Sequence, residues 1–341
     1  TIPIATFLIS ANLDNLTTTM TMLVIMRNIV QNRRQRILIG SAIVLAANAG
    51  GGFTVIGDPA GVILWGGEAV TATNFSAYLF IPAMVAWVLP TLLIQMQLPD
   101  RLDVEWPAMP YRGDDTNLNR WQRVIMLFVG IGGLWFIPTF HNITKLSPFL
   151  GALCVLSILW VVNEAFNRKL INSDKMVQRR SPQSVQYGSI QLILFVMGIM
   201  LAFGVVTETG FFATVSEWLD YNVHNIWIMG VIAGLISGVV DSFTVAMTAI
   251  SMYPVVDVEQ LNLWVDSDYM ENFVQNGAFW KLIVYTTSIG GCLLCFASSS
   301  GLALMKMERI HIGWYFKNIT PKVAVGWLLG MIILWAEVNF F

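Results

Sequence analysis

The sequence predicts an all-α polytopic membrane protein with the inverted-repeat architecture of a transporter, and three observations support this fold class. Of 341 residues, 56% are hydrophobic and only 12% are charged, whereas soluble domains carry about 25% charged residues. Long apolar segments alternate with loops that differ sharply in charge. Two pairs of similar segments also recur along the chain, and both interrupt apolar runs with glycines and small polar residues. Duplicated, interrupted apolar segments are typical of transporters made of two related halves.

The two pairs of similar segments predict where helices break. Residues 50–64 resemble residues 290–304 at an offset of 240, and residues 10–17 resemble residues 237–244 at an offset of 227. Helix breaks at membrane depth leave backbone carbonyls and half-helix ends available to bind ions or substrate. We therefore expect the functional site at these four breaks.

The apolar segments and the basic loops predict the topology. A helix that crosses the hydrocarbon core needs ~20 apolar residues, and the chain has such segments at 2–26, 37–65, 78–97, 124–140, 148–163, 187–206, 226–253, 277–304 and 323–338. Of the 19 Lys and Arg, 17 fall in four basic segments, at 27–36, 98–123, 164–186 and 306–322. By the positive-inside rule these basic segments are cytoplasmic.

Two apolar segments are predicted to be re-entrant hairpins. If residues 226–253 crossed the membrane once, the loop 254–276, which contains no Lys or Arg, would be cytoplasmic and the basic segment 306–322 would lie outside. If the segment enters and leaves on the same face, every loop falls on its expected side. Residues 226–253 are therefore predicted to form a hairpin that opens outward. Through the repeat, residues 1–28 are predicted to form its counterpart, which opens inward.

The resulting plan has seven crossings, two re-entrant hairpins and two broken helices, with the C-terminus outside. We divide the chain into a first-repeat hairpin, broken helix and following span (1–97), a cytoplasmic linker (98–123), connecting or scaffold spans (124–206) and a second-repeat hairpin, broken helix and last span (207–341). The halves are unequal, so we expect N-terminal scaffold helices to be missing from this sequence. We expect an integral membrane protein of a bacterial inner membrane.

Carboxylates inside membrane segments are costly and usually functional, and Asp14, Asp58 and Asp241 lie at the predicted breaks. Oxygen-bearing residues and a flanking glycine accompany them, and a small hard cation binds carboxylate, hydroxyl and carbonyl oxygens. We expect such a cation at Asp14, Asn15, Asp58 and Asp241. The wider set of candidate ion-binding or proton-coupling residues is Asp14, Asn15, Thr17, Thr18, Asn48, Gly57, Asp58, Asp241, Ser242, Thr244, Ser298 and Ser299.

Each of these features also has a structural interpretation. Asp14 and Asp241 could cap the second arms of their hairpins, and Asp58 followed by Pro59 could simply start a helix. The serines at 298–300 could serve close helix packing.

The absence of two kinds of sequence motif narrows the range of functions. The chain has no phosphate-binding Gly-Lys-Ser/Thr motif and no nucleophile–His–carboxylate set in its spans. We expect no enzyme activity, no cofactor and no nucleic-acid partner.

At its motifs the chain resembles the NhaD-type sodium/proton antiporters, within an ion transporter superfamily that also includes arsenite and dicarboxylate carriers. The residues that carry the resemblance are Leu13-Asp14-Asn15-Leu16-Thr17-Thr18, Ala47-Asn48-Ala49-Gly50-Gly51, Ile56-Gly57-Asp58, Asp241-Ser242, Gly290-Gly291 and Ser300 through Met305. The chain departs from the family pattern where Ser242 replaces an Asn and where Pro59-Ala60 replaces threonines. The resemblance implies two inverted repeats, a homodimer, and a transport domain that moves against a scaffold.

We therefore expect a secondary-active antiporter that exchanges Na⁺ or Li⁺ for H⁺ by alternating access. Asp14 and Asp241 are expected to trade a proton for a cation. No Lys or Arg lies near a motif in the sequence, which favours a cationic substrate. Two alternatives remain open: a sodium-coupled carrier of dicarboxylate or arsenite with the same fold, and a non-transporting membrane subunit whose carboxylates only cap helices.

Overall fold

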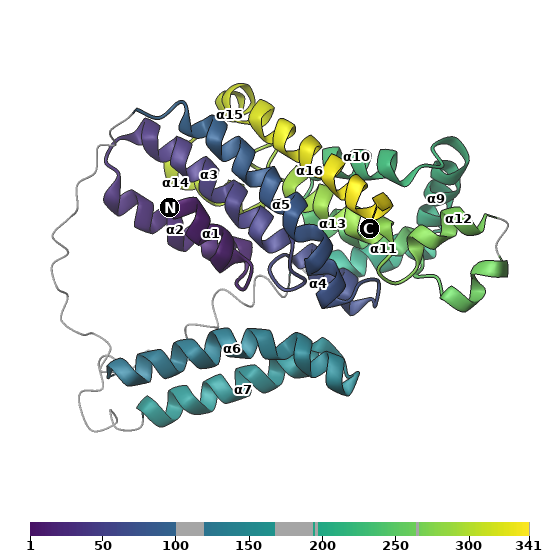
Figure 1. The fold of residues 1–341 in the computed structure, drawn as a ribbon, viewed down its shortest axis with the longest axis horizontal. Coiled ribbons are helices and arrows are strands. Elements are labelled where there is room, and N and C mark those ends of the chain that lie inside the picture. Colours follow the sequence, from purple (N-terminus) through teal and green to yellow (C-terminus); the bar gives the residue numbers. More distant parts are fainter. Residues whose placement is uncertain (100–118, 168–193, 195–196, 264–265, 341) are drawn as a thin grey trace. The chain divides into compact units, whose positions relative to one another are not determined.

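The computed structural model describes the whole chain except residues 100–118, 168–193, 195–196, 264–265 and 341. Within the described residues all regular elements are helices, and the only extended pairing is an isolated bridge between Val256 and Val274. The predicted all-helical architecture is thereby confirmed. The chain forms two compact units, which are described separately (Figure 1): unit 1 comprises Thr1–Pro107 with Thr207–Phe341, and unit 2 comprises Ala108–Val206.

Unit 2 contains two long apolar helices that pack against each other, α6 (Arg120–Thr144) and α7 (Pro148–Asn167). Ile137 is the only buried residue among the 25 of α6. Large apolar side chains such as Leu127 and Phe128 are exposed, as expected of helices that face lipid tails. Together with α5 and α16 of unit 1, these are the four described helices long and apolar enough to cross a membrane. The predicted span 187–206 lies partly outside the described residues.

Unit 1 contains the repeated segments. Its first half is formed by α1 (Ile2–Ser10), α2 (Asn15–Ile29), α3 (Arg33–Gly52), α4 (Pro59–Gly66) and α5 (Ala72–Gln95). A helix at Met197–Glu208, most of which belongs to unit 2, precedes the second half in the sequence. The second half then contains α9 (Phe211–Asn222), α10 (Ile226–Ser237), α11 (Ser242–Met252), η2 (Val258–Leu263), α12 (Ser267–Met270), η3 (Glu271–Phe273), α13 (Ala278–Gly290), α14 (Ser299–Glu308), α15 (Ile312–Asn318) and α16 (Thr320–Phe340). Breaks therefore lie between α1 and α2, α3 and α4, α10 and α11, and α13 and α14, within the four repeated segments.

The two halves of unit 1 repeat the same contacts at the sequence offsets. The hydroxyl of Ser10 donates to the carbonyl of Ala47 at 2.7 Å, and the hydroxyl of Ser237 donates to the carbonyl of Thr287 at 2.7 Å. A Cβ added at Gly50 would collide with the backbone of Phe7, and one added at Gly290 would collide with the backbone of Gly234. The helix pairs α1–α3 and α10–α13 thus share these two contacts at the sequence offsets.

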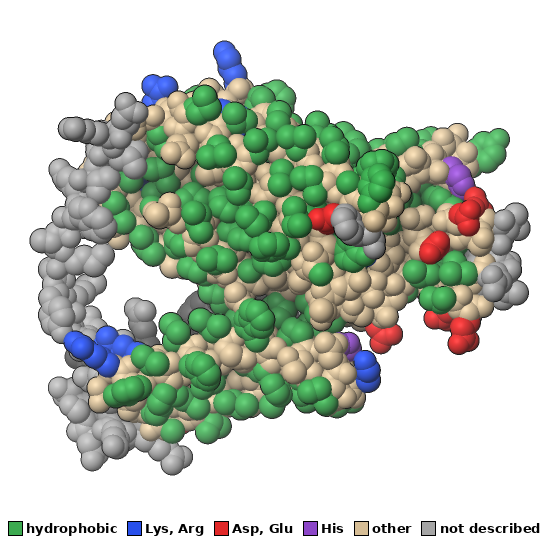
Figure 2. All heavy atoms as spheres, viewed as in Figure 1, with side chains coloured by type: hydrophobic (Ala, Val, Ile, Leu, Met, Phe, Trp, Pro, Cys, Tyr) green, Lys and Arg blue, Asp and Glu red, His purple; other side chains and the backbone are tan. Residues whose placement is uncertain are grey.

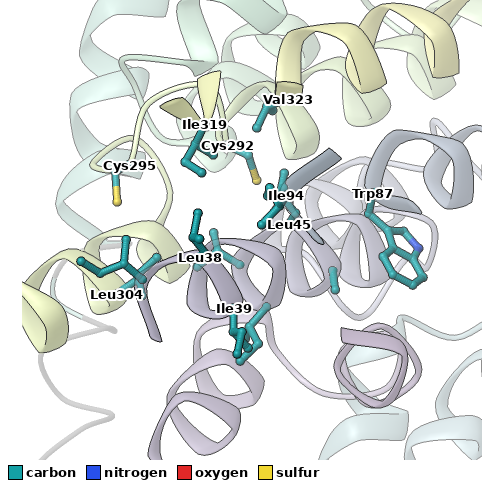
Figure 3. Packing of buried hydrophobic residues seen from close by; sticks show 14 of the residues in the cluster. Leu38, Ile39, Leu45, Trp87, Ile94, Cys292, Cys295, Leu304, Ile319 and Val323 are labelled. Atoms are coloured by element: carbon teal, nitrogen blue, oxygen red, sulfur yellow. The ribbon is translucent and has the colours of Figure 1, made fainter. Parts of the chain in front are cut away.

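Helices α3 and α13 form the interior of unit 1. Every residue of α3 from Ile37 to Gly52 is buried, as is every residue of α13 from Phe279 to Gly290. Figure 3 shows Leu38 and Leu45 of α3 in a cluster with Leu304, Cys292 and apolar side chains of neighbouring helices. The two helices that lead into the α3–α4 and α13–α14 breaks are therefore shielded on all sides by other helices.

Charged side chains of unit 1 are segregated by position. In Figure 2 the Lys and Arg visible on unit 1 lie around α15, whereas most of its visible Asp and Glu lie toward α9 and α12. At the basic end the guanidinium Nε of Arg36 donates to both carboxylate oxygens of Glu308, at 3.0 and 3.1 Å. Arg33 donates to the carbonyl of Glu308 at 2.9 Å. These contacts connect the start of α3 to the end of α14.

Candidate ion-binding site between the helix breaks

The first break places Asp14 at the N-cap of α2. Its carboxylate accepts hydrogen bonds from the backbone N–H groups of Leu16 at 3.1 Å and Thr17 at 3.2 Å. The hydroxyl of Thr17 also donates to Asp14, at 3.4 Å. Side-chain oxygens at this position satisfy N–H groups that the first turn leaves unpaired. Asp14 therefore has the capping role that the sequence left open, and its side chain is exposed.

The third break repeats this arrangement in the second half. Asp241 is the N-cap of α11, and its carboxylate accepts from the backbone N–H of Phe243 at 3.3 Å. Its side chain is half-buried. The fourth break is capped by a neutral residue, since the hydroxyl of Ser298 accepts from the backbone N–H of Gly301 at 3.1 Å.

The second break differs because its carboxylate does not cap a helix. Asp58 precedes Pro59 at the start of α4, but its side chain makes no capping hydrogen bond. Proline at the first helical position has no N–H to satisfy. The Asp58 side chain is only 1% exposed, so its carboxylate needs partners elsewhere, since an unpaired buried charge is strongly unfavourable.

Three side chains supply those partners, one from each of three different helices. The hydroxyl of Ser288 on α13 donates to Oδ2 of Asp58. The hydroxyl of Ser242 on α11 donates to Oδ1 at 3.4 Å, and Nδ2 of Asn15 on α2 donates to the same oxygen at 3.5 Å. All three donors are neutral, so the carboxylate is solvated by dipoles rather than neutralised by a basic side chain.

Asn48 extends this network to the fourth break. Its Oδ1 accepts from Nδ2 of Asn15 at 3.1 Å, and its own Nδ2 donates to the hydroxyl of Ser298 at 3.2 Å and to Sγ of Cys292 at 2.9 Å. The amide of Asn48 therefore connects the first half of unit 1 to the second. We use the name polar cluster for the residues linked in this way, which are Asn15, Asn48, Asp58, Ser242, Ser288, Ser298 and Cys292.

Hydrogen bonds in the polar cluster join the two halves of unit 1, and the repeat relates these bonds to each other. At the offset of 240, Asn48 corresponds to Ser288 and Asp58 corresponds to Ser298. Ser288 of the second half bonds to Asp58 of the first, and Asn48 of the first half bonds to Ser298 of the second. The two bonds are therefore equivalent under the repeat. Only one of the two bonds involves a carboxylate, so the negative charge lies in the first half of unit 1, on Asp58.

The chemistry of the polar cluster suits a small hard cation. Hydroxyl, amide and carboxylate oxygens are the ligands that such cations prefer. Oδ1 of Asn15 is buried and has no hydrogen-bond partner among the residues that the structure describes, which leaves one amide oxygen available. In the same described part of the chain, no group of three or more His, Cys, Asp or Glu side chains is placed to hold a metal ion. The donor set thus fits an alkali cation better than a transition metal.

The structure brings together five of the residues that the sequence singled out, namely Asn15, Asn48, Asp58, Ser242 and Ser298. Gly57 lies beside them, where a Cβ would collide with Gly51 and with the backbone of Ser10. The others lie around the polar cluster rather than in it: Asp14 and Asp241 cap helices, Thr17 bonds to Asp14, Thr18 is buried, Thr244 is half-buried and Ser299 is exposed.

Two members of the polar cluster, Ser288 and Cys292, were not among the residues expected from the sequence. A serine in an apolar run is usually a helix-packing residue. The offset of 240 could have identified Ser288 from the sequence, because at this offset Ser288 is equivalent to Asn48.

Apolar spans, interrupted helices with matching contacts and a buried polar site at the breaks are typical of a polytopic membrane transporter. Comparison with known families agrees with this class and narrows it. The sequence pattern of the citrate transporter family (CitMHS) matches residues 1–257, which is more than half of the chain. The chain belongs to this family.

Individual relatives carry antiporter names. Over 337 residues the chain is 27% identical to sodium/proton antiporter 2 of Arabidopsis thaliana, a match that covers 98% of this chain and 76% of the relative. It is 28% identical over 333 residues to sodium/proton antiporter 1 of the same plant, covering 96% of this chain but only 53% of that relative. It is also 24% identical over 352 residues to the Na(+)/H(+) antiporter NhaD of Vibrio cholerae, covering 96% and 67%. The chain thus spans about half the length of the second of these relatives.

Proposed function

We propose that this protein is a secondary transporter that exchanges Na⁺, or Li⁺, for H⁺. The observation that carries the proposal is Asp58, a buried carboxylate whose three partners are neutral hydroxyl and amide groups. A carboxylate in such a place can be neutralised by a proton or by a cation. The antiporter names of the similar proteins in a plant and a bacterium support the same function.

The exchange would follow from competition for one carboxylate. When Asp58 is ionised, a desolvated cation can bind to it together with neighbouring oxygens such as Oδ1 of Asn15. When Asp58 is protonated, the cation loses its only anionic ligand within the polar cluster and leaves. Asp14 and Asp241, at the caps of α2 and α11, add negative charge around the cluster. We assign them a supporting role in attracting cations.

The transport cycle would rest on the repeated architecture. We propose that α1–α2 and α10–α11 are re-entrant hairpins of opposite orientation, because this topology places every basic loop on the cytoplasmic side. The C-terminus is then outside. Movement of a hairpin-bearing domain in a homodimer would expose the polar cluster to each side in turn. Since the relatives occur in a plant and in bacteria, the bacterial inner membrane stays a prediction.

The proposal can be tested in proteoliposomes that enclose a pH-sensitive dye and carry an imposed pH gradient. Addition of Na⁺ or Li⁺ should drive proton movement in the native protein and not in Asp58→Asn. The matched control is Asp268→Asn, since Asp268 is an exposed carboxylate of α12. Full exchange by a correctly folded Asp58→Asn protein would contradict the proposal.

A sodium-coupled anion carrier is the second candidate, and the family description favours it. Recognition of a citrate-like anion usually uses Arg or Lys donors. None of the hydrogen bonds that the structure gives the polar cluster comes from Lys or Arg. Uptake of labelled citrate that requires Na⁺ and moves no protons would establish this alternative. If the protein transported neither cations nor anions, the result would favour a non-transporting subunit.

A further inference from the structure

Helices α2 and α14 pack side by side (Figure 1), and we call the contact between them the seam. Facing residues along the seam recur at equal steps in the two helices. Nε of Arg27 lies 3.8 Å from Oε1 of Glu308. One turn earlier in each helix, Leu23 and Leu304 both contact the position where a Cβ would stand on Gly40. Both helices therefore run in the same direction, and stepping back four residues in one corresponds to stepping back four residues in the other.

By the same register, the next turn back carries Thr19 on α2 and Ser300 on α14. Both side chains are fully buried, with 0% exposure. Neither hydroxyl oxygen has a hydrogen-bond partner among the residues that the structure describes. Thr18, next to Thr19 and 1% exposed, is in the same state. Buried polar groups without partners are rare because desolvation is costly.

Several other buried hydroxyls in this protein are satisfied by their own helices. The hydroxyl of Thr6 donates to the carbonyl of Ile2 at 2.9 Å, and that of Ser41 donates to the carbonyl of Ile37 at 2.8 Å. Thr286 donates to the carbonyl of Leu282 at 2.8 Å. Thr19 could bond back along α2 in the same way, but it does not. The hydroxyls at the α2–α14 seam are thus left available for a ligand.

The repeat gives an internal comparison for this seam. At the offsets of 227 and 240, the counterparts of Thr19 and Ser300 are Ala246 on α11 and Ala60 on α4. These two helices also pack together, and both alanines are 0% exposed. The symmetry-equivalent seam is therefore closed by methyl groups. Hydroxyls are not required to pack two such helices, so their presence between α2 and α14 needs another reason.

We propose that Thr19 and Ser300, with Thr18 beside them, form a second cation position between α2 and α14, one helical turn from the polar cluster. This inference rests on the proposed function, since the occupant is the alkali cation that the transporter exchanges. Asn15, with its unpaired Oδ1, is one turn from Thr19 in α2, and Ser298 is two residues before Ser300. A cation that leaves Asp58 therefore finds oxygen ligands in the direction of the basic end.

The residues of the seam suit a cation that binds briefly while it passes through the protein. The hydroxyl and amide oxygens are neutral and can coordinate a cation without holding it as a carboxylate would. Beyond them Leu23 and Leu304, each 0% exposed, close the seam, followed by the ion pair of Arg27 with Glu308. The apolar layer would have to separate before a cation reached the basic end. The equivalent seam, lined by Ala246 and Ala60, provides no such position, so the two directions of release are unequal.

The test compares Thr19→Val/Ser300→Ala with a control that also removes two fully buried hydroxyls, Thr6→Val/Ser41→Ala. Both double variants lose the same chemical groups, and only the first loses oxygens that lack a partner. The readouts are the KM for Na⁺ in proteoliposomes and the Na⁺-dependent rise in the thermal stability of the purified protein. We expect the KM for Na⁺ to rise about tenfold in the seam variant and to stay near the native value in the control. Thr19→Ser with native Ser300 should behave as native.

Native exchange together with an unchanged KM in the seam variant would overturn the cation position and leave the proposed function standing. Such a result would mean that the hydroxyls hold only a water molecule. Absence of Na⁺-driven exchange in the native protein would instead overturn the proposed function. If the seam variant does not fold, Thr19→Val alone and Ser300→Ala alone carry the same expectation with a smaller rise in KM. An unchanged KM in both single variants would again overturn the cation position.

Discussion

The hydroxyl of Ser288 donates a hydrogen bond to the carboxylate of Asp58, although the two residues come from opposite halves of the sequence. The bond joins the interior of α13 to the break between α3 and α4. Its counterpart under the repeat joins Asn48 to Ser298. The two halves of unit 1 are therefore connected at their breaks by a pair of equivalent bonds, and only one of the two involves a charge.

We predict that Asp58→Asn abolishes Na⁺-driven proton movement, whereas Asp14→Asn only weakens it. The amide keeps the size of Asp58 and can still bond to its neighbours, but it cannot exchange a proton for a cation. Asp14 is exposed and serves as the cap of α2, and an Asn is an equally good cap. Dye-loaded proteoliposomes would measure both rates. Equal and complete loss in the two variants would place the exchange on the caps instead.

Removal of the Ser288 hydroxyl should weaken cation binding without abolishing transport. In Ser288→Ala the buried carboxylate of Asp58 keeps Ser242 and Asn15 as side-chain donors, so its geometry is less constrained. We expect the KM for Na⁺ to rise about five- to tenfold, because one hydrogen bond to a charged group is lost. The control is Ser251→Ala on α11, whose hydroxyl donates to the carbonyl of Met247 at 2.8 Å. An unchanged KM in Ser288→Ala would show that its bond to Asp58 does not contribute to binding.

Much of this arrangement could be predicted from local sequence. The breaks fall in the repeated segments because glycines and helix-capping residues stop helices wherever they occur. The role of each carboxylate was not predictable in this way. Asp14 and Asp58 both precede a helix, and only the structure shows that one caps its helix and the other turns to Ser288. That difference depends on a helix more than two hundred residues away in the chain.

The seam between α2 and α14 also could not be predicted from the sequence. Thr19 belongs to a run of threonines that would be read as hairpin-tip ligands or as ordinary helix surface. Its relation to Ser300 appears only when two helices from different halves are packed in register, and no sequence offset of the repeat connects these two residues. This contact depends on how the two halves pack against each other, which the repeated segments alone do not specify.

The buried ion pair at the basic end predicts an unequal effect of two arginines on stability. Glu308 is 2% exposed and Arg36 is 16% exposed, whereas Arg27 is 53% exposed. Arg36→Ala leaves the Glu308 carboxylate buried with only the distant Arg27, which should cost about 3 kcal/mol of unfolding free energy. Arg27→Ala should cost less than about 1 kcal/mol, as exposed pairs do. Thermal unfolding in detergent would compare them, and an equal loss would mean that burial does not decide the strength of this pair.

The last prediction concerns the close helix crossings that the two repeats share. Gly50 on α3 lies against the backbone of Phe7, and Gly290 on α13 lies against the backbone of Gly234, so neither crossing has room for a Cβ. Alanine at either position should push the helices apart and cost about 1–3 kcal/mol, since overpacked sites relax poorly.

Gly66 at the end of α4 is the matched control for these crossings, because a Cβ there would meet nothing within 4 Å. Thermal unfolding of the three alanine variants provides the measurement. We expect Gly50→Ala and Gly290→Ala to be destabilised by similar amounts and Gly66→Ala to unfold at the native temperature. Because Asn48 and Ser288 lie two residues before these glycines, the same variants should also raise the KM for Na⁺. A destabilised Gly290→Ala with native cation affinity would mean that the α10–α13 crossing is purely structural and does not set the geometry of the polar cluster.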